Sequence, residues 1–402
     1  MSSLDKKLPD GWMETTLADS VTKLGDGLHG TPKYSDDGEY FFINGNNLND
    51  GKIEIKKETK RCSNEEFEKY KKNLNSRTIL VSINGSLGYF AYYNNEKCFL
   101  GKSACYFNVK ESISKRFIGY QIRTKYFQKY IERLAGGTTI KNISLKTMRE
   151  FPFIIPKNLE EQKAIAKVLT AFDDKIENLR AQNQTLEQTA QTIFKEWFGK
   201  YQVGDELPDG WRIGKLGEIA FNHSKSFKFT EEDVVFVNTG DVSEGQFLHA
   251  NKVSPIGLPG QAKKAIELYD ILYSEIRPKN KRFAFVDFDT SNYVVSTKFM
   301  IIRPKDDFSA HILYLLLKNQ NTVNEFNVIA ESRSGTFPQI TFDSISDFPV
   351  IIPTKEFQNQ FEKILRPLME KERINHQQIQ TLTKTKDTLL PKLMRGEIRV
   401  KI

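Results

Sequence analysis

Two segments of the chain carry apolar side chains at alternating steps of three and four residues. The first segment ends before Gly199 and the second before Gly396, and glycines at such places commonly stop helices. The alternating step is the seam of a heptad helix, and two such helices in one chain usually bury their seams against each other. The seam positions are Ile176, Leu179, Asn183, Leu186, Ala190, Ile193 and Trp197 in the first segment and Ile379, Leu382, Lys386, Leu389 and Leu393 in the second.

We predict that the two helices pair as an antiparallel coiled coil. Asn183 and Lys386 are polar seam residues, which can fix the register of a coiled coil at a cost in stability. The alternative is that each helix packs only on its own domain. Pro391 lies inside the second pattern and predicts a kink or a break. A pair of helices of about forty residues, or roughly 60 Å, would hold two domains at a fixed distance.

The rest of the chain shows short β-type runs separated by Gly, Asn and Asp, which is typical of strands joined by turns. Helices are expected near 115–134 and 309–329, and a proline-bounded strand at 151–156 leads into the first long helix near Leu159. The sequence therefore predicts an α+β fold with two β-rich domains in tandem, separated by the two long helices. The expected strands include Tyr40 to Ile43, Ile79 to Ile83, Ala104 to Val109, Val234 to Asn238, Phe283 to Phe288 and Lys298 to Arg303.

The two domains are copies of one module. The pentapeptide Leu-Pro-Asp-Gly-Trp occurs at 8–12 and again at 207–211. The strand Phe-Pro-Phe-Ile-Ile-Pro at 151–156 returns as Phe-Pro-Val-Ile-Ile-Pro at 348–353. The shared motifs keep their order, whereas the residues between them differ freely. We infer a shared scaffold that displays divergent segments, in two independent domains of one fold.

The composition and net charge of the chain bear on its cellular location and on the class of molecule that it could bind. The chain has 402 residues, of which 39% are hydrophobic and 27% charged, as in a soluble globular protein of two or three domains. No apolar run is long enough for a membrane span, and the N-terminus lacks a signal core. Cys62, Cys98 and Cys105 have neither metal nor disulfide spacing, so we expect a cytoplasmic protein. The net charge of +8 is compatible with binding to nucleic acid.

Tandem modules of this kind, each closed by a proline-bounded strand and followed by a long helix, resemble the DNA specificity subunit of type I restriction–modification enzymes. The second Glu-Gln signature is degraded to Glu356-Phe357-Gln358, and the Gly-Thr-Pro-Lys signature has no clear equal near 222–228. The residues that carry the resemblance are Leu8 to Trp12, Gly30-Thr31-Pro32-Lys33, Gly137-Thr138-Thr139, Phe151 to Pro156, Glu160-Glu161-Gln162 and their second-copy partners.

The resemblance implies a domain plan and a function. Residues 1–156 and 206–353 would be the two target recognition domains, with 157–205 and 354–402 as the central and distal helical spacer regions. Each recognition domain would read one half of a bipartite, asymmetric site in double-stranded DNA. The helices would set the spacing and dock two methyltransferase subunits, and the assembly would recruit two restriction–translocase subunits. The chain itself would be non-catalytic and hold no cofactor, because S-adenosylmethionine, ATP and Mg²⁺ would be bound by the partner subunits.

Catalytic motifs are missing from the sequence. Gly101-Lys102-Ser103 lacks the upstream glycine of a phosphate-binding loop, no methyl-donor fingerprint precedes a helix, and the five histidines have no zinc spacing. These absences argue against a self-contained nuclease or methyltransferase and predict no metal site. A DNA-independent helical scaffold is the other alternative, and neighbouring genes that encode neither a methyltransferase nor a helicase-like nuclease would favour it.

Candidate DNA-reading residues are polar or cationic side chains on loops. The sharpest feature is 277–282, because its four cations cannot be buried together and must face phosphate or water. For a single Ser, Thr or Asn, capping a turn is the simpler role. The candidates are Thr31, Lys33, Tyr34, Arg77, Ser82, Asn84, Ser86, Lys102, Ser103, Thr138, Thr139 and Lys141 in the first copy and Arg277, Lys279, Asn280, Lys281, Arg282, Thr297, Lys298, Arg333, Ser334 and Thr336 in the second.

The parts that repeat form a frame, and the parts that fail to repeat are the expected readers. Two unlike readers on one frame predict a bipartite site whose halves differ. Residues 1–200 carry 32 Lys and Arg against 25 Asp and Glu, a net charge of +7, whereas residues 201–402 carry +1. We therefore expect the first copy to depend more on phosphate contacts than the second.

Overall fold

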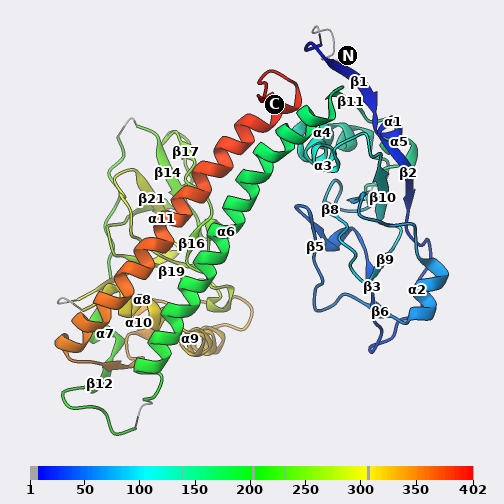
Figure 1. Cartoon of the computed structure of the whole chain (residues 1–402). Coiled ribbons are helices and arrows are strands. Elements are labelled where there is room, and N and C mark those ends of the chain that lie inside the picture. Colours follow the sequence, from blue (N-terminus) through cyan, green and yellow to red (C-terminus); the bar gives the residue numbers. More distant parts are fainter. Residues whose placement is uncertain (1–7, 138, 202–203, 231, 306–307, 402) are drawn as a thin grey trace. The chain divides into compact units, whose positions relative to one another are not determined.

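The computed structural model describes residues 8–137, 139–201, 204–230, 232–305 and 308–401. The chain forms two compact units (Figure 1). Unit 1 contains the residues up to 178 together with those from 378 onward, and unit 2 contains residues 179–377. Each unit therefore combines one of the repeated modules with parts of both long helices. Within the described residues, no helix is both long and apolar enough to cross a membrane.

Unit 1 is built on a four-stranded antiparallel sheet with the order β2-β10-β7-β8. A second sheet has the order β6-β3-β9, and the leader strand β1 pairs with the closing strand β11. Ile79 and Phe107 of the first sheet share a core with Phe117 of α3 and Phe127 of α4. The elements of the first module are β1 Trp12–Thr16, α1 Leu17–Ser20, β2 Val21–Asp26, β3 Tyr40–Ile43, β4 Leu48–Asn49, β5 Lys52–Ile53, β6 Arg61–Cys62, α2 Asn64–Tyr70, β7 Thr78–Ser82, β8 Phe90–Tyr92, β9 Cys98–Leu100, β10 Ala104–Val109, α3 Lys115–Arg123, α4 Lys125–Leu134, α5 Leu145–Arg149 and β11 Pro152–Pro156.

Unit 2 repeats this plan. Its sheet β13-β22-β19-β20 is antiparallel, its sheet β17-β14-β21-β18 has one strand more than the counterpart, and β12 pairs with β23. The elements of the second module are β12 Arg212–Lys215, α7 Leu216–Ile219, β13 Ala220–Asn222, β14 Val234–Val237, β15 Val242–Ser243, β16 Gln246–Phe247, β17 Lys252–Val253, β18 Ala262–Ala265, β19 Ile271–Ser274, β20 Phe283–Phe285, β21 Tyr293–Ser296, β22 Phe299–Pro304, α8 Ala310–Lys318, α9 Gln320–Arg333, α10 Phe342–Ile345 and β23 Pro349–Ile352.

The matching topologies confirm the duplication and the α+β class. In both units the second sheet contains a parallel pair, β3 with β9 and β14 with β21. One prediction was wrong in detail, because each helix expected near 115–134 and 309–329 is two helices. Thr124 begins α4 by accepting a hydrogen bond from the Phe127 N–H, and Asn319 begins α9 in the same way. These caps turn the backbone and end the preceding helix.

The two long helices are α6, Leu159–Phe198, and α11, Lys355–Met394. In unit 2 their contacts run from Asn183 with Asn375 to Phe198 with Phe357, so the two segments are antiparallel. The break expected at Pro391 does not occur, since α11 continues to Met394. Pro391 falls in the last turn, where the buried neighbours Leu390, Leu393 and Met394 hold the helix in the core of unit 1.

A buried asparagine pair occupies the seam in unit 2. The Asn375 Nδ2 donates to the Asn183 Oδ1 over 2.9 Å, and the Asn183 Nδ2 reaches the Glu372 carbonyl at 3.4 Å. Asn375 lies four residues before Ile379 and therefore continues the heptad that the sequence shows, although it was not among the predicted seam residues. The polar character of Asn183 is thus satisfied by a second polar residue on the facing helix.

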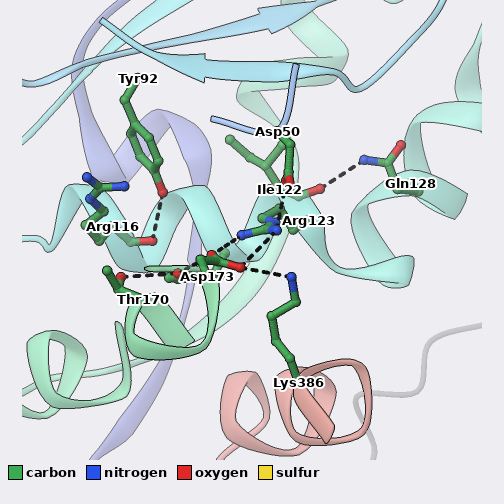
Figure 2. A network of polar contacts seen from close by, with 10 residues as sticks. Asp50, Tyr92, Arg116, Ile122, Arg123, Gln128, Thr170, Asp173 and Lys386 are labelled. Carbon is green, nitrogen blue, oxygen red and sulfur yellow. Dashed lines mark hydrogen bonds and ion pairs between the residues drawn. The ribbon is translucent and has the colours of Figure 1, made fainter. Parts of the chain in front are cut away.

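An ionic network joins the first module to both long helices in unit 1 (Figure 2). Asp173 of α6 accepts hydrogen bonds from Arg123 at the end of α3, from Lys386 of α11 at 2.9 Å and from Tyr120 at 2.7 Å. Arg123 also pairs with Asp50 at 2.8 Å. Lys386, predicted as a polar seam residue, is therefore neutralised by a carboxylate shared with the module.

The pKa of Asp173 reflects this setting. Burial alone would raise it, but the hydrogen bonds from Arg123, Lys386 and Tyr120 and the charge of Arg123 outweigh burial and hold the pKa below its ordinary value. A carboxylate whose pKa is lower in the folded than in the unfolded chain adds stability at neutral pH. That stability is lost as the pH falls through the folded pKa.

We predict that Asp173→Asn lowers the free energy of unfolding at pH 7 by about 2 kcal/mol, because two largely buried cations lose their charged acceptor. The difference from the wild type should shrink as the pH is lowered, since protonation of Asp173 removes the same charge. Urea unfolding at pH 7 and at acidic pH measures both effects. Asp174→Asn, at the exposed neighbouring residue, is the matched control. An equal loss at both pH values would contradict the role of the charge.

We further predict that Asn375→Ala costs about 2 kcal/mol, since it leaves a cavity and removes the donor to Asn183. The double variant Asn183→Leu with Asn375→Leu should be close to the wild type in stability or above it, because an apolar pair fills a seam well. Chemical unfolding of Asn183→Leu, Asn375→Leu and the double variant gives the coupling energy. Additive effects would show that the two side chains do not depend on each other.

Candidate nucleic-acid interface

Three loops of unit 1 are joined by backbone hydrogen bonds where β7 ends. The N–H of Ile83 donates to the Ser103 carbonyl over 2.9 Å, and the Ile83 carbonyl accepts from the Ile143 N–H at 2.8 Å. The N–H of Gly85 donates to the Lys141 carbonyl over 2.9 Å. The segments that meet here are 84–88, 102–103 and 135–142. Three of the candidate stretches in the first copy therefore lie together.

The same arrangement exists in unit 2, where β19 ends. The N–H of Glu275 donates to the Lys298 carbonyl over 3.0 Å, and the Glu275 carbonyl accepts from the Ile340 N–H at 2.9 Å. The N–H of Arg277 donates to the Pro338 carbonyl over 3.1 Å. The segments that meet here are 277–282, 297–298 and 333–338. All the candidate stretches of the second copy thus lie at the position in unit 2 that the three candidate segments occupy in unit 1.

The backbone of the first loop is similar in shape in the two units but differs in residue type. Gly85 and Gly88 have φ values of 78° and 80°, and Arg277 and Lys281 take the corresponding positions with φ values of 46° and 52°. The equivalence follows from the pairing at the loop ends. The Ser82 N–H donates to the carbonyl of Tyr89, the residue after Gly88. In the same way, the Ser274 N–H donates to the carbonyl of Arg282, the residue after Lys281. The second module therefore carries cations in a left-handed conformation that favours glycine.

The cations of this loop differ in their partners. Lys279 lies 3.7 Å from Glu331, and Lys281 lies 4.0 Å from Glu244. Arg277 is exposed, and within the described part of the chain no carboxylate pairs with it. Pro278 is buried, and the short helix that it begins packs against α9. The loop is therefore held in place while the side chains of Arg277 and Lys279 are exposed, as phosphate binding requires.

The loop with Thr31, Lys33 and Tyr34 lies apart from this set of hydrogen bonds. The Lys33 N–H donates to the Glu66 carboxylate at 2.9 Å, and the Tyr34 ring packs at 6.2 Å from that of Phe42. Its start is near the other loops, since the Leu28 N–H donates to the Leu100 carbonyl just before Gly101. The side chains of Thr31, Lys33 and Tyr34 are exposed.

Two sequence candidates are structural. The Arg77 guanidinium donates to the carbonyls of Val109, Lys110 and Ile113. Ser82 is buried, and its Oγ accepts from the Tyr89 N–H at 2.9 Å. These two side chains stabilise the sheet and its turn, so they are not part of the surface that could contact DNA. The reason is that β7 and its flanks are core on both sides, which the local sequence does not reveal.

The remaining candidates divide by exposure. Asn84, Ser103, Lys281, Arg282 and Thr297 are half-buried, and the Ser103 Oγ bridges Gly45 and Asn44. Thr138 lies outside the described residues. We call the three segments that meet in each unit its three-loop set. The exposed candidates of the two three-loop sets are Ser86, Lys102, Thr139, Lys141, Arg277, Lys279, Asn280, Lys298, Arg333, Ser334 and Thr336.

Two further observations concern groups that could take part in catalysis. No set of three or more His, Cys, Asp or Glu residues among them could hold a metal ion. Burial raises the pKa of Cys98 and of Cys105 to about 12, so both remain protonated thiols and poor nucleophiles.

Comparison with known proteins identifies the family. The family model described as the type I restriction modification DNA specificity domain matches residues 9–188 and again residues 208–384. The chain belongs to the type I restriction–modification DNA specificity family. The resemblance inferred from the sequence is therefore confirmed, and so is the tandem arrangement of two specificity domains. Each matched range includes one module and most of the long helix that follows it.

Individual relatives agree with the family. The chain is 52% identical to the specificity subunit of the HindI type I restriction enzyme of Haemophilus influenzae over 174 residues, which cover 43% of this chain and 38% of that protein. It is 27% identical to the MjaIX specificity subunit of Methanocaldococcus jannaschii over 92% of this chain and 86% of that protein. The solved S subunit from M. genitalium has the same fold, with a TM-score of 0.64 at 20% identity over 99% of both chains.

The sequence did not reveal two features of these specificity domains. Tyr89, the residue after segment 84–88, is 50% exposed, and Arg282 takes the corresponding position in the second module. Gln128 of α4 donates to the Gly88 carbonyl at 3.4 Å and to the Ile122 carbonyl at 3.0 Å, and so braces the loop against the helices. Only the alignment of the loop ends in three dimensions makes Tyr89 and Arg282 comparable.

We predict that Arg277→Gly is about 1 kcal/mol more stable than Arg277→Ala. Both variants lose the cation, but only glycine relieves the left-handed backbone, and its larger unfolded-state entropy offsets part of the gain. Urea unfolding of the two variants measures the difference. Equal stabilities would mean that relieving the φ of 46° at this position gains no more than the extra entropy that glycine loses on folding.

Proposed function

We propose that this chain is the non-catalytic DNA-specificity subunit of a type I restriction–modification complex. Each module would read one half of a bipartite, asymmetric target in double-stranded DNA. The observation that carries the proposal is the pair of three-loop sets, which occupy the same position in both units but present different residues. A frame that repeats with readers that differ is what recognition of two unlike half-sites requires.

The first module presents small and polar groups. Gly85 is exposed and leaves the backbone of its turn accessible, and Asn84 and Ser86 supply groups that can bond to base edges. The second module presents Arg277 and its neighbours, whose side chains reach further and suit phosphate or guanine. The two sets are therefore suited to different DNA contacts, which supports an asymmetric site.

The long helices would set the spacing of the half-sites and dock two methyltransferase subunits, which would in turn recruit two restriction–translocase subunits. Support comes from their outer faces. Both helices carry exposed polar residues along their length, whereas their seam residues are withdrawn from solvent. The buried seam residues are Ile176, Leu179, Asn183, Ala190 and Leu393, and the half-buried ones are Leu186, Ile193, Trp197, Ile379, Leu382, Lys386 and Leu389. S-adenosylmethionine, ATP and Mg²⁺ would be bound by those partners. The complex would act in the cytoplasm, which suits the three free thiols of this chain.

The test uses the complex of this chain with its methyltransferase subunits. Replacing Arg277, Lys279, Lys281 and Arg282 together by Ala should weaken binding to the target duplex. The plot of log affinity against log salt concentration should also become less steep, with its negative slope reduced in magnitude by about 0.9 for each phosphate that is no longer neutralised. Fluorescence anisotropy over a salt series measures both quantities, with the target first identified by sequencing methylated sites in the host genome.

The control is Arg212→Ala with Lys215→Ala, which removes exposed cations from the leader strand β12 rather than from a loop. Assembly with the methyltransferase subunits should be unchanged in both variants. Wild-type affinity and salt slope in the quadruple variant would overturn the placement of this interface. A wild-type complex that fails to bind DNA with sequence preference would overturn the proposed function itself and favour a DNA-independent scaffold.

A further inference from the structure

One large apolar side chain is exposed on the loop that precedes Lys141 in unit 1 and on the loop that precedes Pro338 in unit 2. Ile140 is 62% exposed and Phe337 is 49% exposed. Neither side chain is part of the hydrophobic cores formed by the described residues of its unit. Single exposed apolar residues are common and need no explanation. These two need one because they recur at the same place in two modules.

The equivalence of Ile140 and Phe337 rests on backbone pairing. Ile140 precedes Lys141, whose carbonyl accepts from Gly85, and Phe337 precedes Pro338, whose carbonyl accepts from Arg277. Gly85 and Arg277 are themselves equivalent, so both apolar residues stand one position before the same hydrogen bond. They are consequently adjacent to the first reader loop in each unit.

Local contacts restrain the backbone beside each of these two residues. A Cβ on Gly137 would overlap the Ile140 carbonyl oxygen, and Gly137 has a φ of 94°, so only glycine fits this tight turn. In unit 2 the Phe337 N–H donates to the Ser334 Oγ at 3.1 Å. A backbone that keeps an apolar side chain exposed to water forgoes the gain of burying that side chain. A ligand that covers it would recover that gain.

We propose that Ile140 and Phe337 make apolar contacts with the bases of the DNA, one in each half-site. The inference rests on the proposed function and adds a type of contact that charge and hydrogen bonding do not supply. Proteins that hold the sugar–phosphate backbone with cations can place an apolar side chain on a base ring or on the 5-methyl group of thymine. The flanking cations, Lys141 in unit 1 and Arg277 in unit 2, are placed to hold the phosphates nearby.

The experiment compares Ile140→Ala and Phe337→Ala in the complex with methyltransferase subunits. Each should weaken binding to the target duplex by about 5- to 50-fold, the range expected when one base is left without an apolar or stacking partner. The salt slope should keep its wild-type value because no charge is removed. The melting temperature should also be unchanged because both side chains are exposed. Phe337→Leu should retain more affinity than Phe337→Ala.

Matched controls are Met13→Ala in unit 1 and Ile256→Ala in unit 2, which remove apolar side chains that are 39% and 89% exposed and lie outside the three-loop sets. Both should bind DNA as the wild type does. Duplexes with uracil in place of thymine separate the two kinds of contact. Weaker binding of the wild type, without further loss in the Ala variant, identifies the methyl group, and unchanged binding identifies the ring.

Wild-type affinity in both Ala variants would overturn the inference while leaving the proposed function intact. So would a loss of affinity that is accompanied by dissociation of the methyltransferase subunits, because Ile140 and Phe337 would then be protein contacts. If the wild-type complex itself showed no sequence preference, the proposed function would fail instead. The two failures are therefore distinguishable in one series of titrations.

Discussion

The pairing of α6 with α11 inside each unit is the constraint on which the rest of this molecule depends. Neither module closes its core alone. In unit 1, Leu390, Leu393 and Met394 of α11 join Ile165 and Leu169 of α6 under the sheet, and Arg399 reaches back to Glu161. In unit 2, Phe194 and Phe198 of α6 meet Phe361 and Leu365 of α11. Each recognition module is therefore stabilised by the helix of the other copy as well as by its own.

This constraint has a consequence for folding. The first module needs Leu390, Leu393 and Met394, which follow the second module in the sequence, so its core is complete only after the second module has been synthesised. Contacts of such long sequence separation fold slowly, because the entropy of closing the loop must be overcome before the contacts form. The Asp173 network places a specific ionic contact at this junction. Its shared carboxylate selects one register of Lys386 against the module, which an apolar seam alone would specify less strictly.

Much of the frame could be predicted from the sequence because periodic burial leaves a periodic pattern. The heptad steps located both long helices, and the repeated leader and closing strand located the modules. The split at Thr124 was missed because the apolar pattern continues across it, and only the capping hydrogen bond marks the boundary. Asn375 was missed although it continues the heptad, because it lies before Ile379, the first apolar residue assigned to the second seam. Asn183 and Lys386 could be assigned because apolar seam residues lie on both sides of them. The candidate loops could be predicted as loops but not as a set, because their grouping depends on hydrogen bonds between residues far apart in sequence, such as Gly85 with Lys141.

Arg77 shows the opposite error. Its charge suggested DNA, but a guanidinium can satisfy three buried carbonyls as well as a phosphate.

Local charge at the loops also differs from the charge of the two halves. The first half of the chain has a net charge of +7 and the second only +1, yet the loop sets of unit 2 hold Arg277, Lys279, Lys281, Arg282, Lys298 and Arg333, against Lys102 and Lys141 in unit 1. Charges further apart than about 10 Å are largely screened at moderate salt. The phosphates would therefore respond to the cations of the nearest loops rather than to the net charge of a module. On this argument we expect the second module, rather than the first, to depend more on phosphate contacts.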